Sequence, residues 1–112
     1  MTMTLYSRAG ACSMAPQIVM EELDLDYELV MVERDKLNTP EHLAVNPMGQ
    51  VPSLATGDGL MTESVAILLY LGEKYGEGRL MPPPGSWERG QMMMRMLFLA
   101  SQEHPAFGLW LR

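Results

Sequence analysis

Runs of alternating and helically spaced apolar residues divide the first third of the chain into a strand, a helix and a second strand. Thr2–Ser7 alternates polar and apolar residues at first, and Tyr27–Val32 is rich in strand formers, so both are predicted strands. Between them, Ser13 caps a predicted helix that carries Pro16 in its first turn and ends near Asp24. Because a helical crossover joins the two strands, we expect them to be parallel. The apolar face of the helix contains Ile18, Val19, Met20 and Leu23.

The middle of the chain is predicted to form a short helix and a hairpin. Thr39-Pro40-Glu41 is typical of a helix start, and His42, in the same polar segment, is expected to face solvent. Further on, Thr56-Gly57-Asp58-Gly59 predicts a tight turn between strands at Ser53–Ala55 and Leu60–Met61.

Two longer helices follow the hairpin. Ser64–Tyr75 has no polar face over its first two turns, so we expect both of its sides to be covered. Gly76–Gly85 contains three consecutive prolines and is a predicted linker. Ser86 then caps a last long helix, in which Arg95 is the sole charge in the middle. The methionines of this helix indicate adaptable packing at an interface rather than a soft-metal site, since no thiolate or second histidine joins Met92, Met93, Met94 and Met96.

The order of these elements is β-α-β, a loop helix, then β-β-α. This order predicts a thioredoxin-like α/β fold, a mixed sheet with helices on both faces, followed by one long helix. We expect one domain at residues 1–80, a linker at 81–85 and a helical region at 86–112.

Composition and charge exclude several classes of function. With 112 residues, 47% of them apolar, the chain is long enough for one globular domain. A net charge of −6 argues against nucleic acid or an anionic membrane surface as a partner. The single cysteine excludes an internal disulfide and a cysteine zinc cluster. Since no signal peptide pattern or bilayer-length apolar run is present, the cytoplasm is the expected location.

The stretch from Asn46 to Ser64 carries the pattern most indicative of binding. Asn46-Pro47 initiates a turn, and Pro52 precedes a strand at a place where a cis bond is expected. A cis bond there would leave the N–H and C=O of Val51 without sheet partners, so a small peptide could pair with them as a short added strand. Glu63-Ser64 opens an apolar helix, where an anion can bind the free N–H groups and Glu63 can take an ammonium group.

These motifs resemble the glutathione-binding domain of the glutathione transferases. The resemblance rests on Asn46-Pro-x-Gly-x-Val-Pro52 and Glu63-Ser64-x-Ala-Ile67, and it runs from about Met3 to about Met81. The opening Leu5-Tyr6-Ser7-x-x-Gly10-Ala11-Cys12-Ser13 is similar to the bacterial, beta-type members in particular. The resemblance implies that glutathione is the substrate, that a small hydrophobic electrophile is its partner and that no metal takes part. It also implies a second, all-helical domain, of which residues 86–112 would be only the start.

Cys12 and Ser13 compete for the role of the group that contacts the thiol of glutathione. Cys12 begins a helix, where N–H groups favour the thiolate, and in the beta-type pattern this cysteine is the catalytic residue. Ser13 is at least as well explained as a helix cap. Tyr6 occupies the strand end that other branches of the family use to activate the thiol. Because the cysteine takes over this role in the beta-type pattern, Tyr6 is expected mainly to form the wall of the site or part of the core. The Glu103-His104-Pro105 segment resembles the place where beta-type enzymes bring a histidine to the thiol, so His104 is a third catalytic candidate.

The remaining candidates would hold the rest of glutathione. The resemblance implies that Lys36 lies near the glycyl carboxylate, although Arg34 could do the same work and a solvated loop charge is an equal alternative. Gln50, Val51 and Pro52 lie in the matching motif and are expected to line the site, together with Glu63 and Ser64 at the start of the apolar helix.

Three functions remain open from the sequence. The first is glutathione transfer, in which the thiolate of glutathione attacks an electrophile. The second is glutathione-dependent thiol–disulfide exchange through Cys12, and the third is a binding module without catalysis. Because the last two helices carry so many apolar residues, we also expect a homodimer.

Overall fold

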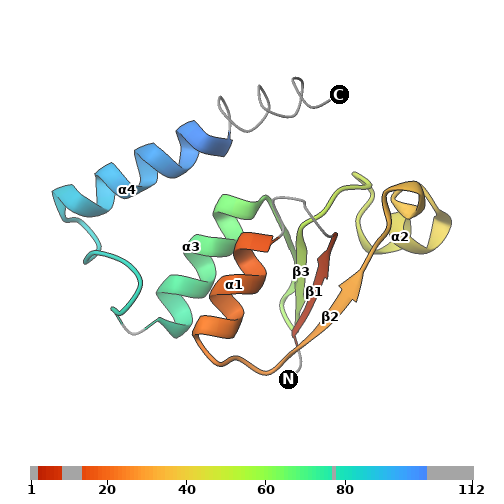
Figure 1. The fold of residues 1–112 in the computed structure, drawn as a ribbon, viewed down its shortest axis with the longest axis horizontal. Coiled ribbons are helices and arrows are strands. Elements are labelled where there is room, and N and C mark those ends of the chain that lie inside the picture. Colours follow the sequence, from red (N-terminus) through yellow and green to blue (C-terminus); the bar gives the residue numbers. More distant parts are fainter. Residues whose placement is uncertain (1–2, 9–13, 77, 101–112) are drawn as a thin grey trace. The chain divides into compact units, whose positions relative to one another are not determined.

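The computed structural model describes residues 3–8, 14–76 and 78–100. The chain divides into two compact units, Met1–Leu71 and Gly72–Arg112, with α3 continuing from the first into the second. No helix in these residues is long and apolar enough to cross a membrane. The elements, labelled in Figure 1, are β1 (Met3–Ser7), α1 (Met14–Glu22), β2 (Tyr27–Met31), the 3₁₀-helix η1 (Arg34–Lys36), α2 (Pro40–Val45), β3 (Ser53–Thr56), β4 (Gly59–Thr62), α3 (Ser64–Tyr75) and α4 (Trp87–Phe98).

The first unit is built on a four-stranded mixed sheet with the order β2-β1-β3-β4. β1 runs parallel to β2 and antiparallel to β3, and β3 and β4 form an antiparallel hairpin. The order of strands and helices confirms the predicted thioredoxin-like fold, followed by one further helix. Each predicted strand and helix in the described residues is present, with ends that differ by a few residues at most.

The register of the four strands places one end of each strand at the same edge of the sheet. The segments with the predicted site residues begin or end at these strand ends. Ser7 pairs with Met31, Tyr6 with Ser53, and Ser53 with Thr62. The carboxyl ends of β1, β2 and β4 therefore meet the amino end of β3. We call this edge the Ser7 end of the sheet.

The two faces of the sheet have different coverings. Leu5 and Leu54, paired across β1 and β3, are fully buried, as are Met20 of α1 and Ile67 and Leu71 of α3. Figure 1 shows α1 and α3 on the same side of the sheet. Burying each of these side chains contributes about 1.5–3 kcal/mol. Since side chains alternate along a strand, the residues next to them in β1 and β3 face the opposite side, toward α2.

The apolar face predicted for α1 is partly wrong. Pro16, Met20 and Leu23 are buried, at intervals of four and three residues, and they form one stripe. Ile18 lies about 200° around the helix from Pro16, and its side chain is 61% exposed. The helix ends at Glu22, two residues before the predicted end.

The last turn of α1 is tied to β2 by a hydrogen bond from the Tyr27 hydroxyl to the Glu21 carboxylate, 2.6 Å long. Burial, together with the hydrogen bond and the negative charge of Glu21, raises the pKa of Tyr27 to about 12. The phenol is therefore neutral near pH 7 and donates this hydrogen bond.

Predicted covering of α3 is only partly confirmed. Ile67 and Leu71 are fully buried, and the apolar residues between these two are half-buried. Ala66, by contrast, is exposed. The helix begins at Ser64 and ends at Tyr75, as predicted.

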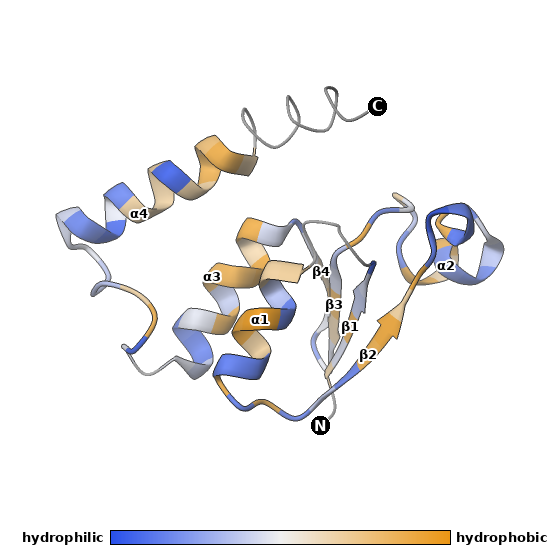
Figure 2. Ribbon diagram, viewed as in Figure 1, coloured by the Kyte–Doolittle hydropathy of each residue, from blue (hydrophilic) through white to orange (hydrophobic). Residues whose placement is uncertain are grey.

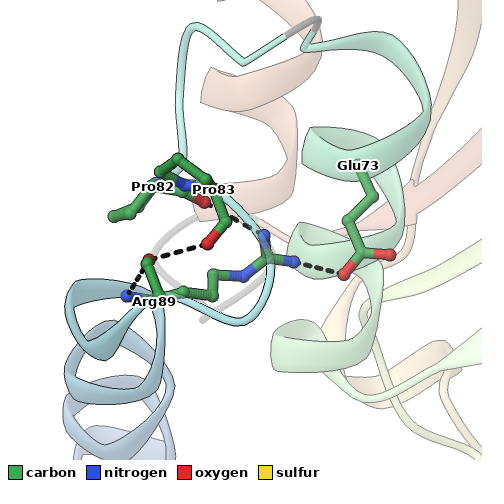
Figure 3. Close-up of polar contacts among 5 residues, drawn as sticks. Glu73, Pro82, Pro83 and Arg89 are labelled. Atoms are coloured by element: carbon green, nitrogen blue, oxygen red, sulfur yellow. Dashed lines mark hydrogen bonds and ion pairs between the residues drawn. The ribbon is translucent and has the colours of Figure 1, made fainter.

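The second unit is held together at its start by Arg89, a residue that the sequence analysis did not single out (Figure 3). The Arg89 side chain is buried and forms an ion pair with the Glu73 carboxylate of α3. A second nitrogen of its guanidinium donates to the Pro82 carbonyl at 3.2 Å. Its backbone N–H donates to the Ser86 hydroxyl, which confirms Ser86 as the cap of α4, and that hydroxyl donates to the Pro83 carbonyl at 2.7 Å.

The contacts of Arg89 predict a local loss of stability when they are removed. We expect Arg89→Met to lower the protection of backbone amides in residues 86–90 by about 1.5–3 kcal/mol, because a charged hydrogen-bonding group with two partners is lost. Amide hydrogen exchange measures this change. Arg95→Met is the matched control, since Arg95 is an exposed arginine of the same helix and should change exchange little. Equal protection in the two variants would contradict the role of Arg89.

Candidate functional site

The loops at the Ser7 end of the sheet bring together most of the site residues that the sequence predicts. Arg8 follows β1, and η1 with Lys36 follows β2. Val51 and Pro52 precede β3, and Glu63-Ser64 follows β4. Segments from four separate parts of the chain are gathered here, although only the last two lie near each other in the sequence.

A compact turn built around Asn46 leads into this edge. Asn46 ends α2, is 1% exposed, and its side-chain oxygen accepts the backbone N–H of Met48 at 3.0 Å. Its backbone carbonyl accepts the N–H of Gly49 at 2.9 Å. Gly49 has φ +66°, and a Cβ at that position would lie 3.1 Å from the Leu37 carbonyl oxygen. The predicted turn is confirmed, and its positive φ and close backbone contact explain why a glycine stands at position 49.

The carbonyl oxygen of Gln50 accepts hydrogen bonds from two buried side chains. The Asn46 amide nitrogen Nδ2 lies 3.0 Å away, and the His42 ring nitrogen Nε2 lies 3.4 Å away. The Gln50 residue itself is exposed, so its backbone, not its side chain, is held by the domain.

The expectation that His42 faces solvent is wrong. His42 is 5% exposed, and its ring meets the ring of Tyr6 edge-on, with centroids 6.3 Å apart and an interplanar angle of 64°. Tyr6 points to this face of the sheet because the neighbouring Leu5 points to the other. Spacing offered one signal for this packing: His42 and Asn46 lie four residues apart, on one face of α2.

Val51 and Pro52 have the backbone that the sequence predicts. The Val51–Pro52 peptide bond is cis, which confirms the prediction. Val51 is half-buried, and within residues 3–8, 14–76 and 78–100 its backbone N–H and C=O have no hydrogen-bond partner. Beside them, the hydroxyl of Ser53 is buried and likewise lacks a partner among the described residues.

Glu63 and Ser64 form the start of α3. Glu63 is exposed and has φ +71°, a left-handed conformation that is uncommon for a residue with a side chain. Its carbonyl accepts the N–H of Ile67 at 3.0 Å, so the helix begins directly after it. Ser64 is half-buried in the first turn, where backbone N–H groups have no partner within the helix.

Cationic residues lie at the same edge despite the acidic composition of the chain. Arg34 and Lys36 are exposed in η1, and Arg8, which is not among the predicted site residues, is half-buried after β1. In the part of the chain that the structure describes, no cluster of three or more His, Cys, Asp or Glu residues could hold a metal ion.

The predicted thiol-contacting residues lie mostly outside the described residues. Cys12, Ser13 and His104 all belong to segments of which the structure gives no description. Tyr6, which was expected mainly to form the wall of the site or part of the core, is half-buried at the Ser7 end with its ring against His42.

Comparison with known proteins assigns the family. Residues 1–73 match the family model for the glutathione S-transferase N-terminal domain. The chain belongs to the glutathione S-transferase family. It is 38% identical over 109 residues to glutathione S-transferase GstA of Escherichia coli O157:H7, covering 94% of this chain and 54% of that protein.

Two solved structures of the family are similar in both sequence and fold. A glutathione transferase homologue from Sulfitobacter, with bound glutathione, is 34% identical with a TM-score of 0.86, over 95% of this chain and 52% of that one. The beta-class glutathione S-transferase of Sphingomonas chungbukensis is 37% identical with a TM-score of 0.83, over 93% of this chain and 54% of that one. The resemblance to bacterial beta-type members is thus confirmed, and the chain spans about half the length of the relatives it matches.

Proposed function

We propose that this domain binds glutathione and promotes attack of its thiolate on a small hydrophobic electrophile. The observation that carries the proposal is the strand register, which brings the unpaired backbone of Val51, the start of α3 and the cations of η1 to one edge of the sheet. Glutathione is a peptide with two carboxylates and an ammonium group, so it needs this combination of a backbone pair, anion sites and a cation site.

The chemistry of each group assigns it a part of the ligand. The N–H and C=O of Val51 pair with the backbone of the central cysteinyl residue, beside Pro52. The α-carboxylate of the γ-glutamyl end binds Ser64 and the first N–H groups of α3, and Glu63 takes its ammonium group. Lys36 or Arg34, with Gln50, contacts the glycyl carboxylate.

The thiol group of glutathione reacts after it has lost its proton. Hydrogen bonds from Cys12 or Ser13, with His104 as a further candidate, lower the pKa of this thiol from about nine toward neutrality and raise the thiolate fraction on the order of tenfold or more. With an aromatic halide, the sulfur forms a bond to carbon, and the halide leaves with the electron pair of the broken bond.

We also propose that the chain forms a homodimer through α4. Figure 2 shows hydrophobic residues gathered toward the carboxyl end of α4, and the exposed ones are Met93, Met94, Leu97, Phe98 and Leu99. Water contact with so many large apolar side chains favours association with a second copy. We also propose that the chain is divided into a domain at residues 1–80, a linker at 81–85 and a helical region at 86–112, which contains α4.

Light scattering tests the dimer. At micromolar concentration we expect a mass twice the 12.6 kDa of one chain. Substituting Met94→Glu and Phe98→Glu together should give the monomer mass, because two charges one turn apart on α4 oppose burial. Met48→Glu is the control, since Met48 is 73% exposed and lies outside α4. A monomer in the unaltered chain would contradict the proposal.

Calorimetric titration tests the glutathione site. Ser64→Ala should weaken binding by about 1–3 kcal/mol, because the bound carboxylate loses a hydrogen-bond donor, and Glu63→Gln should weaken it by removing the charge that faces the ammonium group. Ser86→Ala is the matched control: this serine caps α4 in the second unit, and its loss should leave the affinity unchanged. Unchanged affinity in both site variants would show that Glu63 and Ser64 only start the helix.

Cys12 separates transfer from thiol–disulfide exchange. The chain contains no other thiol, so exposure to oxidised glutathione should add one glutathione to the unaltered protein and none to Cys12→Ala, as seen by intact mass. Conjugation of an aromatic halide that survives in Cys12→Ala supports transfer assisted by Ser13. Reduction of a mixed disulfide without conjugation would instead indicate an oxidoreductase. Glutathione binding without either activity would indicate a binding module.

A further inference from the structure

We propose that Asn46 is a positioning residue for glutathione, which acts by holding the Gln50 carbonyl so that the N–H of Val51 faces the ligand. His42 makes a second, weaker contact with the same carbonyl. The inference rests on the proposed function, because it concerns how the backbone of Val51 is oriented before glutathione arrives. Neither side chain is required to touch glutathione.

Asn46 uses both ends of its buried amide. The oxygen Oδ1 accepts the N–H of Met48 and the nitrogen Nδ2 donates to the Gln50 carbonyl, each at 3.0 Å. Its backbone N–H donates to the His42 carbonyl at 2.8 Å, which fixes Asn46 to the last turn of α2. The side chain therefore links the end of a helix, the turn and the residue that precedes Val51.

The geometry of a peptide bond carries this constraint from Gln50 to Val51. The bond between them is trans, and its six atoms lie close to one plane. In such a unit the C=O of Gln50 and the N–H of Val51 point in opposite directions. Because the carbonyl points at Asn46 and His42 in the interior, the N–H points away from them. The orientation of this N–H is thus set by two side chains that contact the carbonyl at the opposite edge of the peptide unit.

His42 adds a second, longer contact. Its Nε2 lies 3.4 Å from the same carbonyl, beyond the usual range for a strong hydrogen bond. Its ring is fixed edge-on against Tyr6, so the position of Tyr6 and that of the Gln50 carbonyl depend on one imidazole. The lengths of the two contacts predict that Asn46 matters more than His42.

Asn46→Asp is the informative variant. It keeps the oxygen that accepts from Met48 but places a second oxygen against the Gln50 carbonyl, which repels it. We expect glutathione affinity to fall about tenfold, the equivalent of one well-formed hydrogen bond. Asn38→Asp is the matched control, because Asn38 is the other asparagine, is exposed and receives the same charge, so any general repulsion of the anionic ligand appears there too.

His42→Phe tests the smaller contribution. Phenylalanine keeps a ring against Tyr6 and removes the nitrogen that contacts Gln50. We expect a loss of affinity of about twofold to threefold, since a bond of this length is weak. A loss larger than that of Asn46→Asp would overturn the assignment of Asn46 as the principal positioning residue.

A measurement on the unaltered protein decides the question even where a variant does not fold. Without glutathione, the ¹⁵N order parameter of the Val51 amide should be about 0.85, the value of rigid backbone, and should fall in folded Asn46→Asp but not in Asn38→Asp. A value below about 0.6 in the unaltered protein would overturn the proposal, as would glutathione affinity in folded Asn46→Asp within twofold of that in Asn38→Asp. If the unaltered protein does not bind glutathione while its Val51 amide is rigid, the proposed function is wrong, but the fixing of the Gln50 carbonyl by Asn46 and His42 is supported.

Discussion

The pairing of β1 with a neighbouring strand on each side is the constraint on which the rest of the first unit depends. β1 is parallel to β2 on one side and antiparallel to β3 on the other. This register decides that Leu5 faces the core while Tyr6 faces α2, and a shift by one residue would exchange them. It also brings four chain segments to the Ser7 end. The candidate site is therefore a consequence of strand register more than of any single loop.

Local patterns were sufficient to predict most of the fold. Strand alternation, Thr39 and Ser86 as helix caps and the Asn46-Pro47 turn all act within a few residues of the feature they cause, so they can be identified in a sequence. The cis bond before Pro52 was predicted for a similar reason, because its motif is contiguous.

Contacts between distant residues were not predictable in the same way. His42 was taken as exposed because its neighbours in the chain are polar, but its burial depends on Tyr6, which comes from another strand. Arg89 was missed because its partner Glu73 lies 16 residues earlier in a different helix. Both side chains are polar groups whose burial is stabilised only by partners that the tertiary structure supplies. The sequence alone therefore identified the backbone that is proposed to face the ligand, but not the buried His42 side chain that contacts the Gln50 carbonyl beside it.

The two ends of α3 take part in different charge interactions, and the dipole of the helix contributes to both. At its amino end, partially positive N–H groups follow Glu63 at the Ser7 end of the sheet, where the carboxylate of glutathione is proposed to bind. Near its carboxyl end, the guanidinium of Arg89 pairs with Glu73, placing a buried cation beside the last turn. The proposed carboxylate and the Arg89 cation both have the sign that the helix dipole favours, and Arg89 offsets the Glu73 carboxylate, which the dipole disfavours at that end. The edge where the anion would bind is not uniformly acidic despite the net charge of −6, because Arg8, Arg34 and Lys36 lie there beside the acidic Glu33, Asp35 and Glu63. The proposed binding of an acidic peptide would therefore depend on how the individual cations are placed at this edge, rather than on the overall charge balance.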